Sequence, residues 1–215
     1  MSAGKREKEL ASRLLAWWRK SKRSYPWRRE KNPYKVLIAE LMLQRTKADQ
    51  VMAVYPSFLE RFQTPRALAA ARLEDVEVFF RRLGLIWRAK KVKGLGDALV
   101  MNFNSQVPDT REGLLSLPGV GEYAADAVLA SVYGETVAAV DANVCRVIGR
   151  LFGMEARGEA RRDPKFKEVA QRMVPESRAK EFNWAMIDFA ALICTPRNPK
   201  CCTCPLAKIC KFNLC

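Results

Sequence analysis

The hydrophobic positions of this chain recur with helical spacing almost from end to end. Two clear stripes are Leu10, Leu14, Trp17 and Trp18 near the N-terminus and Val144, Val147, Ile148, Leu151 and Phe152 in the second half. Apolar residues spaced three and four apart share one face of an α-helix. No segment alternates with the period of two that favours a strand. The pattern therefore predicts an all-α protein.

Capping residues mark the expected helix starts. Asn32, Thr64 and Asp163 each precede a proline, which is typical of an N-cap followed by the first helical position. Asp109 with Glu112 resembles a capping box. The connections are short, with no internal repeat and no low-complexity linker. We expect closely packed helices without a floppy boundary.

The charge balance indicates a polyanionic partner. The 215 residues include 38 Lys and Arg against 23 Asp and Glu, a net charge of +15. Nucleic acid is the commonest partner of such a chain, although a generally basic surface has the same composition. No apolar run approaches a membrane span, and the N-terminus lacks a signal-peptide core. This predicts a cytoplasmic protein, associated with the nucleoid if the source is prokaryotic.

Four cysteines near the C-terminus form the clearest chemical motif, Cys194-x6-Cys201-x2-Cys204-x5-Cys210. Four thiolates suit a 4Fe-4S cluster or a tetrahedral zinc ion, and the single short gap favours the cluster because zinc sites usually have two. Thiolates held for metal imply a reducing compartment. The other cysteines are Cys145, a small core residue by this interpretation, Cys202, which could exchange with a neighbouring ligand, and Cys215.

A glycine-rich turn is the second motif. Residues 115–124 read LSLPGVGEYA, with helical segments on both sides of Gly119 and Gly121. Glycines let the backbone turn sharply and approach a ligand, and the amides that open the second helix face an anion. On a basic protein a DNA phosphate suits this place, although a glycine turn between packed helices is also common.

Together the motifs resemble the helix-hairpin-helix DNA glycosylases of the endonuclease III and MutY superfamily. The resemblance rests on YPWRREKNPYKVLIAELMLQRT, LPGVGEYAADAV, VDANVCRVIGR and the four-cysteine loop, in the family's order. It implies a six-helix barrel domain with the hairpin over residues 28–137. It also implies a 4Fe-4S cluster domain from residues 1–27 and 138–215, with a DNA cleft between the two. We expect a monomer that binds double-stranded DNA with a mismatched or damaged base.

Asp141 is the catalytic carboxylate that the resemblance implies. It lies 18 residues after Tyr123, as in the family pattern. Breaking an N-glycosidic bond builds positive charge on the sugar, and a fixed anion beside C1′ stabilises it or activates the attacking water. An ordinary N-cap is the alternative. The chain has no histidine, so carboxylates, Tyr, Lys or water must move protons.

Tyr123 separates the subclasses of the family. Bifunctional relatives carry Lys here, whose amine attacks C1′ to form a Schiff base, and a phenol cannot do this. MutY-type adenine glycosylases typically have Ser, whereas Tyr resembles the Mig-type enzymes that remove thymine or uracil opposite guanine. Aromatic packing on neighbouring residues would also account for Tyr123.

Glu40 is the only charge in the apolar run of residues 36–43. Burial there favours a protonated carboxyl, which could hydrogen-bond the target base, the role that the MutY resemblance implies. A solvated face of an amphipathic helix is the alternative, but the run is apolar on every side.

The remaining candidates are expected to contact DNA. Gln44 matches the family's polar plug and Leu85 its apolar wedge, which fill and part the stack when a base is flipped. The hairpin contributes Leu117, Gly119, Val120 and Gly121. Phosphate contacts are expected from Arg88, Lys91, Arg197 and Lys200, with Lys90 and Lys93 nearby. Any one of these cations alone is better explained by solvation.

These residues predict a monofunctional DNA glycosylase that flips thymine or uracil mispaired with guanine and removes it by hydrolysis. One alternative is a MutY-like adenine glycosylase acting opposite 8-oxoguanine, but the chain ends just past Cys210, leaving no room for the recognition domain of full MutY-type enzymes. The other is a catalytically silent iron-sulfur DNA-binding module, which the combination of Asp141, Glu40 and Tyr123 disfavours. Pocket shape must decide between thymine and uracil, which differ by one methyl.

Overall fold

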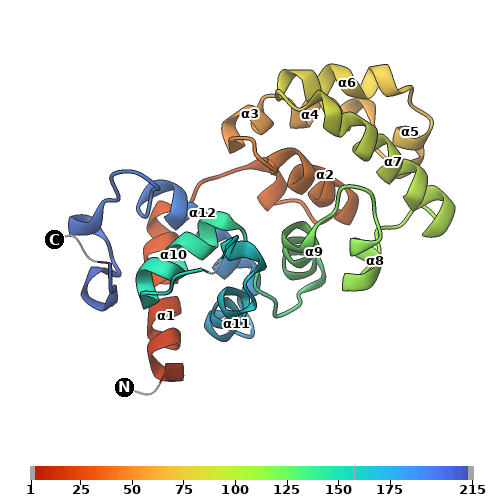
Figure 1. The fold of residues 1–215 in the computed structure, drawn as a ribbon. Helices are drawn as coiled ribbons and strands as arrows, with labels where there is room; N and C mark the ends of the chain where they lie inside the picture. Colours follow the sequence, from red (N-terminus) through yellow and green to blue (C-terminus); the bar gives the residue numbers. More distant parts are fainter. Residues whose placement is uncertain (1–2, 157, 213–215) are drawn as a thin grey trace. The chain divides into compact units, whose positions relative to one another are not determined.

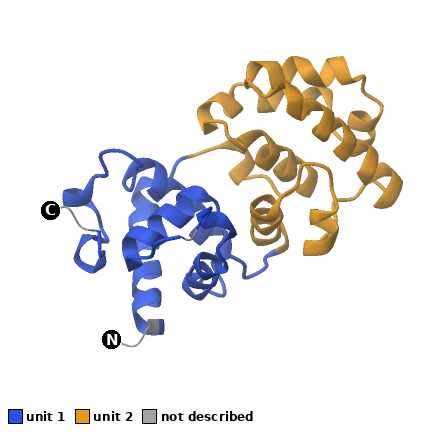
Figure 2. Ribbon diagram, in the orientation of Figure 1, with its two compact units in different colours: residues 1–23, 134–215 blue, residues 24–133 orange. Residues whose placement is uncertain are grey.

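The described residues fold into helices joined by turns and loops, which confirms the all-α prediction. The computed structural model describes residues 3–156 and 158–212, and within these ranges no strand occurs (Figure 1). Two compact units are present, residues 24–133 and residues 1–23 with 134–215 (Figure 2). We call them the central unit and the terminal unit. In the described part of the chain, no helix is long and apolar enough to cross a bilayer.

The central unit consists mainly of short helices. Its elements are η1 (Pro26–Arg28), α2 (Pro33–Leu43), α3 (Ala48–Met52), α4 (Tyr55–Arg61), α5 (Pro65–Ala69), α6 (Leu73–Arg82), α7 (Ile86–Asn102), α8 (Arg111–Leu115), α9 (Glu122–Val128) and the π-helical turn η2 (Leu129–Tyr133). The long helix α7 packs against α5 and α6, and α2 packs against α9. Gly96 permits the close approach of α7 to α5, because a Cβ there would lie 2.8 Å from the backbone nitrogen of Ala69.

Helix α2 runs through the core of the central unit. Leu37, Ile38 and Leu41 are almost completely buried. This follows from a sequence that is apolar on every side of the helix. An aromatic cluster lies elsewhere in the same core, where the ring of Phe58 stands 4.9 Å from that of Phe62.

The terminal unit joins the two ends of the chain. Its elements are α1 (Ala3–Ser21), α10 (Ala142–Phe152), η3 (Ala160–Arg162), α11 (Pro164–Met173), α12 (Ala179–Leu192), η4 (Cys201–Thr203) and η5 (Ala207–Ile209). Helix α12 packs against both α1 and α10. Helix α1 therefore depends on a partner that follows it by more than 150 residues.

Asp188 fixes the pairing of α1 with α12. Its side chain is fully buried. It accepts a hydrogen bond from the indole N–H of Trp18 at 2.8 Å and another from the guanidinium of Arg23 at 2.6 Å. Because a buried carboxylate is tolerated only when it is paired, these two donors and Asp188 hold one another in place.

Three of the predicted helix starts are confirmed. The side-chain oxygens of Asn32, Thr64 and Asp163 accept backbone N–H groups in the first turns of α2, α5 and α11. Each cap satisfies a donor that has no partner inside its own helix.

The predicted capping box at Asp109 and Glu112 is wrong, because Thr110 is the N-cap of α8. The Thr110 hydroxyl accepts the backbone N–H of Gly113 at 3.2 Å. Its extended backbone (φ −102°, ψ 150°) places the hydroxyl beside the first turn. Glu112 is then the second helical residue, whereas a capping box requires the third.

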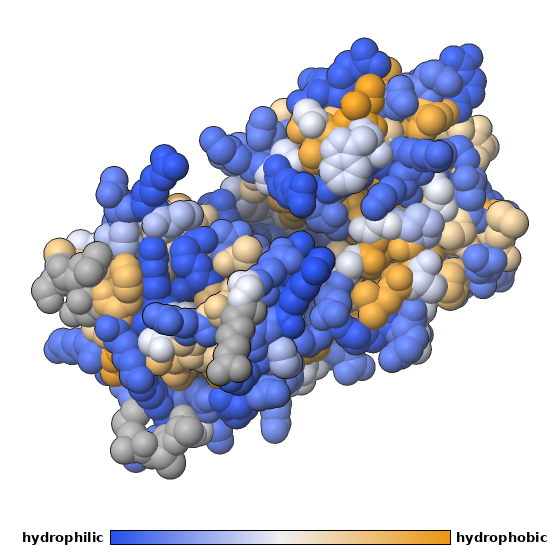
Figure 3. Space-filling view, viewed as in Figure 1, coloured by the Kyte–Doolittle hydropathy of each residue, from blue (hydrophilic) through white to orange (hydrophobic). Residues whose placement is uncertain are grey.

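The exposed surface carries both polar and apolar side chains. The face shown in Figure 3 is largely hydrophilic, with small hydrophobic areas set among the polar groups. The large apolar side chains with the highest exposure in the described residues are Met52, Val78, Ile86, Trp87, Met101 and Phe212.

Candidate functional site

Helices α8 and α9 form the predicted hairpin, and the turn between them presents backbone rather than side chains. Gly119 is left-handed (φ +84°), a conformation that favours glycine. The side chains of Leu117 and Val120 are buried. Gly121 precedes α9, whose leading amides have no partner within the helix. This geometry suits recognition of a phosphate through backbone N–H groups.

Gln44 lies beside this turn. It is the residue after the end of α2, and its side-chain amide donates to the carbonyl of Gly119 at 3.2 Å. Lys91 of α7 is also adjacent, since a Cβ built at Gly119 would lie 3.3 Å from the Lys91 Cβ. The fold thus brings together three predicted DNA-contact positions from segments that are distant in sequence.

Arg88 is buried in the same region, which we call the hairpin junction: the turn at Gly119 with its neighbours Gln44 and Lys91. It is 4% exposed, and its guanidinium donates to the carbonyls of Leu41 at 3.0 Å and Gln44 at 2.6 Å. Burial lowers the pKa of Arg88, and nearby Arg45 lowers it further. Arg88 therefore holds the start of α7 against the end of α2. Its phosphate contact stays a prediction, as does that of the exposed Lys91.

The segment from Gly84 to Trp87, which enters the first turn of α7, exposes other apolar side chains than Leu85, which the sequence singles out. Gly84 is left-handed (φ +71°), and Leu85 is only 7% exposed. Ile86 and Trp87 are exposed instead, at 41% and 52%. Trp87 was missed by sequence reasoning. The signal that could have found it is an aromatic residue just before four basic residues at 88–93.

Two of the three predicted catalytic residues belong to the central unit. Glu40 in α2 is 7% exposed, which confirms its predicted burial. Tyr123 is half-buried in the first turn of α9. Because α2 and α9 pack against each other, Glu40 and Tyr123 lie on two helices that are in contact. Their chemical roles stay predictions.

Asp141 belongs to the terminal unit, where it is the N-cap of α10. One carboxylate oxygen accepts the backbone N–H of Val144 at 2.8 Å, and the other accepts the side-chain amide of Asn143 at 2.8 Å. The capping interpretation is therefore confirmed. The same two donors fix the orientation of a half-buried carboxylate, which is also what an electrostatic catalyst requires.

The four motif cysteines line one pocket of the terminal unit, with lining residues that include Arg150, Phe212, Cys194, Cys201, Cys204 and Cys210. All four are free thiols and half-buried. Burial raises the pKa of Cys204 to about 11, the other three cysteines add to this, and the backbone N–H of Leu206 opposes it. The Arg150 guanidinium donates to the Cys194 sulfur at 3.4 Å.

The chemistry of the donor set suits a 4Fe-4S cluster, which takes one thiolate at each of four corners, or a tetrahedral zinc ion. Within the described ranges, no three His, Cys, Asp or Glu side chains are gathered so that they could hold one metal ion. Cys202 is disulfide-bonded, Cys145 is a buried core residue as predicted, and Cys215 lies outside the described residues.

The loop between the first two motif cysteines carries two predicted phosphate contacts. Arg197 and Lys200 are exposed there. Arg150 braces the loop by donating to the carbonyls of Thr195 at 2.7 Å and Pro196 at 3.0 Å. Lys90, which lies in α7 near the predicted phosphate contacts Arg88 and Lys91, is exposed.

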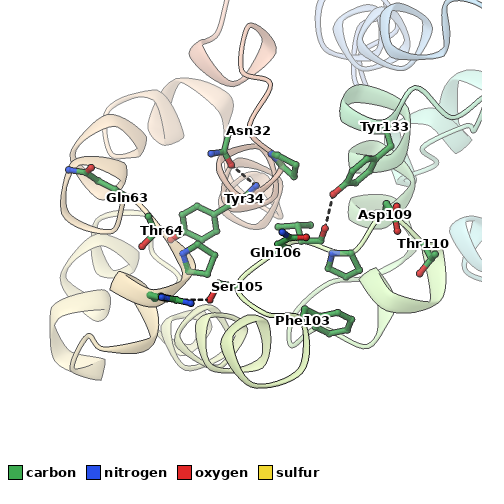
Figure 4. Close-up of a pocket in the computed structure, with 15 residues that line it drawn as sticks. Asn32, Tyr34, Gln63, Thr64, Phe103, Ser105, Gln106, Asp109, Thr110 and Tyr133 are labelled. Carbon is green, nitrogen blue, oxygen red and sulfur yellow. Dashed lines mark hydrogen bonds between the residues drawn. The ribbon is translucent and has the colours of Figure 1, made fainter.

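A separate cavity of about 930 Å³ opens in the central unit (Figure 4). Asn32 and Tyr34 border it at the start of α2, and Phe103 borders it just past the end of α7. Gln44 and Leu85 lie at the opposite ends of these two helices. This cavity is therefore distinct from the hairpin junction.

Comparison with known proteins decides the family. Residues 38–173 match the family described as HhH-GPD superfamily base excision DNA repair protein. The match spans more than half of the chain. This chain belongs to the HhH-GPD superfamily.

Relatives within the superfamily resemble the chain over most of its length. It is 39% identical over 205 residues to the thymine/uracil-DNA glycosylase of Pyrobaculum aerophilum, with 93% of this chain and 89% of that protein covered. It is 38% identical over 195 residues to the adenine DNA glycosylase of Mycobacterium tuberculosis, with 90% of this chain but 64% of that protein covered. The solved structure of a thermostable thymine-DNA glycosylase matches with a TM-score of 0.93 at 33% identity, covering 99% of each chain.

Proposed function

We propose that this protein is a DNA glycosylase of base excision repair that hydrolyses the N-glycosidic bond of thymine or uracil mispaired with guanine. The observation that carries the proposal is its likeness, over nearly the whole length of both chains, to enzymes named thymine/uracil-DNA glycosylase and thymine-DNA glycosylase. The hairpin turn and the net charge of +15 suit a DNA substrate.

Asp141 is the proposed electrostatic catalyst. As the bond from sugar to base breaks, positive charge develops on the sugar, and a fixed carboxylate stabilises that charge without having to reorganise. Its hydrogen bonds to Val144 and Asn143 supply the fixed orientation. The carboxylate can also orient the attacking water, since the chain offers no histidine.

Tyr123 makes the proposed reaction a simple hydrolysis. A phenol has no amine with which to form a Schiff base at C1′, so the strand should stay intact after the base leaves. We assign Glu40 to the target base, because a buried carboxyl on α2 can exchange hydrogen bonds with a flipped pyrimidine.

We also propose that Cys194, Cys201, Cys204 and Cys210 hold a 4Fe-4S cluster. Their common pocket and free thiols support this assignment. The cluster would cross-link the loop from residue 194 to residue 210 and so fix Arg197 and Lys200 for phosphate contact. A role in folding and DNA docking follows, because the loop is remote in sequence from the proposed catalytic residues.

The cluster proposal predicts a brown protein when purification is anaerobic. Cys201→Ala should lose the visible absorbance and the iron and sulfide measured in the pure protein, because one of four ligands is gone. Cys145→Ala is the matched control and should stay brown, since Cys145 is a free cysteine outside the four-ligand spacing. One zinc per chain in a colourless protein would contradict the assignment, and loss of colour in Cys145→Ala would show that the loss in Cys201→Ala is not specific to a ligand.

The adenine glycosylase alternative is less favoured. Tyr123 occupies the place where the MutY resemblance implies Ser.

A panel of duplexes tests the function. They carry G·T, G·U, A opposite 8-oxoguanine and G·hypoxanthine, and each is treated with alkali to cut at abasic sites. We expect alkali-dependent cuts at T and U opposite G. Cutting only at A opposite 8-oxoguanine would support the MutY-like alternative, and no cutting at all would support a silent DNA-binding module.

A further inference from the structure

Trp87 is an exposed aromatic side chain that the proposed mechanism leaves without a role. It is the second residue of α7, and 52% of its surface is exposed, next to Ile86 at 41%. Tryptophan is highly buried on average. Its exposure beside a second large apolar residue therefore marks a contact surface.

The surroundings of Trp87 are basic. The Arg88 Cζ lies 4.7 Å from the centroid of the indole ring, and the Lys91 Nζ lies 5.8 Å from it. Exposed Lys90 adds a further charge. Aromatic rings combined with cations are how proteins bind unpaired bases and their phosphates. A nucleic acid complements this surface in both respects.

Contacts of the two cations place Trp87 at the hairpin junction. Arg88 donates to the Gln44 carbonyl at 2.6 Å. The side chain of Gln44 donates in turn to the Gly119 carbonyl, and Lys91 borders the same glycine. The indole therefore borders a group of residues that are predicted to contact DNA.

We propose that Trp87 stacks on a base that becomes exposed when the duplex opens. Leu85 is buried in this structure, so Trp87 is the large ring that this segment offers to DNA. Arg88 holds the first turn of α7 through two backbone carbonyls and lies against the ring. This inference rests on the proposed glycosylase function and extends it.

The test compares binding of a G·T duplex and the fully paired duplex across a range of salt concentrations, in the Asp141→Asn background so that base release is slow. We expect Trp87→Ala and Trp87→Leu to weaken G·T binding by about tenfold to a hundredfold, the range for one stacked base. The paired duplex should be affected less, because its bases stay stacked. Trp87→Phe should keep most of the affinity, because it keeps a ring.

Salt dependence separates stacking from charge. Trp87 variants should leave the slope of log affinity against log salt unchanged, whereas Lys91→Ala should reduce it by about one, because only a cation releases counterions. Met101→Ala is the matched control: this residue is 81% exposed on the same helix and should bind as the parent does. Thermal unfolding checks that each variant is folded.

Wild-type affinity in both Trp87→Ala and Trp87→Leu would overturn the inference, as would an equal loss on the paired duplex or in Met101→Ala. Base release by the wild-type protein is measured separately. If release occurs and Trp87 has no effect on binding, the inference fails while the proposed function stands. If release fails while Trp87 contributes to binding, the proposed function fails and the stacking surface stands.

Discussion

Asp141 combines a structural and a proposed chemical role at one residue. As an N-cap it satisfies the backbone N–H of Val144, and as a catalyst it must remain in one place while charge develops nearby. The two roles are compatible, because the hydrogen bonds that cap α10 also limit the motion of the carboxylate. They separate experimentally, because capping needs an oxygen acceptor and catalysis needs its charge.

Replacing Asp141 by Asn removes the charge and keeps the cap. We expect base release to fall by about a hundredfold to a thousandfold, the usual loss for an electrostatic stabiliser. The melting temperature should change little, because Asn caps helices about as well as Asp. Single-turnover kinetics with a G·U duplex and a thermal melt measure the two effects.

Asp163→Asn is the matched control for Asp141→Asn. Asp163 caps α11 in the same unit through the backbone N–H of Lys165. We expect normal base release from this variant. Normal turnover in Asp141→Asn would instead leave Asp141 as a helix cap only.

Tyr123 offers a test by gain of function. Tyr123→Lys places an amine where the bifunctional relatives have one, and we expect a complex that borohydride traps, together with strand cleavage without alkali. Trapping should still require Asp141, so the double variant with Asp141→Asn should not trap. The wild-type protein should give no trapped complex, and efficient trapping by it would mean that another amine reaches C1′.

At the scale of the elements, the hairpin depends on a backbone conformation rather than on side chains. Gly119 is left-handed, and a Cβ on it would press against the Cβ of Lys91 at 3.3 Å. Both facts make this position intolerant of substitution, whereas most positions in a connection tolerate change.

Gly119→Ala should destabilise the protein by about 1–2 kcal/mol, the cost of a left-handed conformation for a residue with a Cβ. DNA affinity should fall as well, because the turn moves. Gly94→Ala is the control within α7: its Cβ would meet only Pro118 at an ordinary 3.8 Å, and alanine should stabilise the helix by roughly 0.5–1 kcal/mol. Urea titrations and binding isotherms measure both effects, and equal stability of Gly119→Ala and wild type would contradict the account.

For the whole molecule, the terminal unit exists only because distant parts of the chain meet. Helix α1 has its packing partners in α11 and α12. The buried Asp188 makes that meeting specific, since Trp18 and Arg23 donate to it from the N-terminal part of the chain.

Asp188→Ala should destabilise the terminal unit by about 3–5 kcal/mol, because it removes the buried carboxylate that accepts the indole N–H of Trp18 and pairs with the Arg23 guanidinium. Denaturation followed by tryptophan fluorescence measures this. Asp75→Asn is the control: its ion pair with Arg61 at 2.9 Å is exposed on both sides and should contribute less than about 1 kcal/mol. Similar small losses in both variants would show that Asp188 does not hold α1.

The sequence by itself determined the features that are encoded locally. The all-helical character, the caps at Asn32, Thr64, Asp163 and Asp141, and the burial of Glu40 follow from patterns within a few residues. The family follows from motifs read in order along the chain. Such signals are short-range, because a cap or an apolar run acts through its own helix.

Only the tertiary structure decided which side chains of the segment from Leu85 to Arg88 face solvent. Three consecutive apolar residues, Leu85, Ile86 and Trp87, are followed by a cation, and the sequence favours the cation as the exposed contact. In the fold Arg88 is buried against carbonyls of α2, while Trp87 is exposed. The physical reason is that burial depends on what packs against each face of α7. The carbonyls that receive Arg88 come from residues more than 40 positions earlier, which no local pattern around Arg88 specifies.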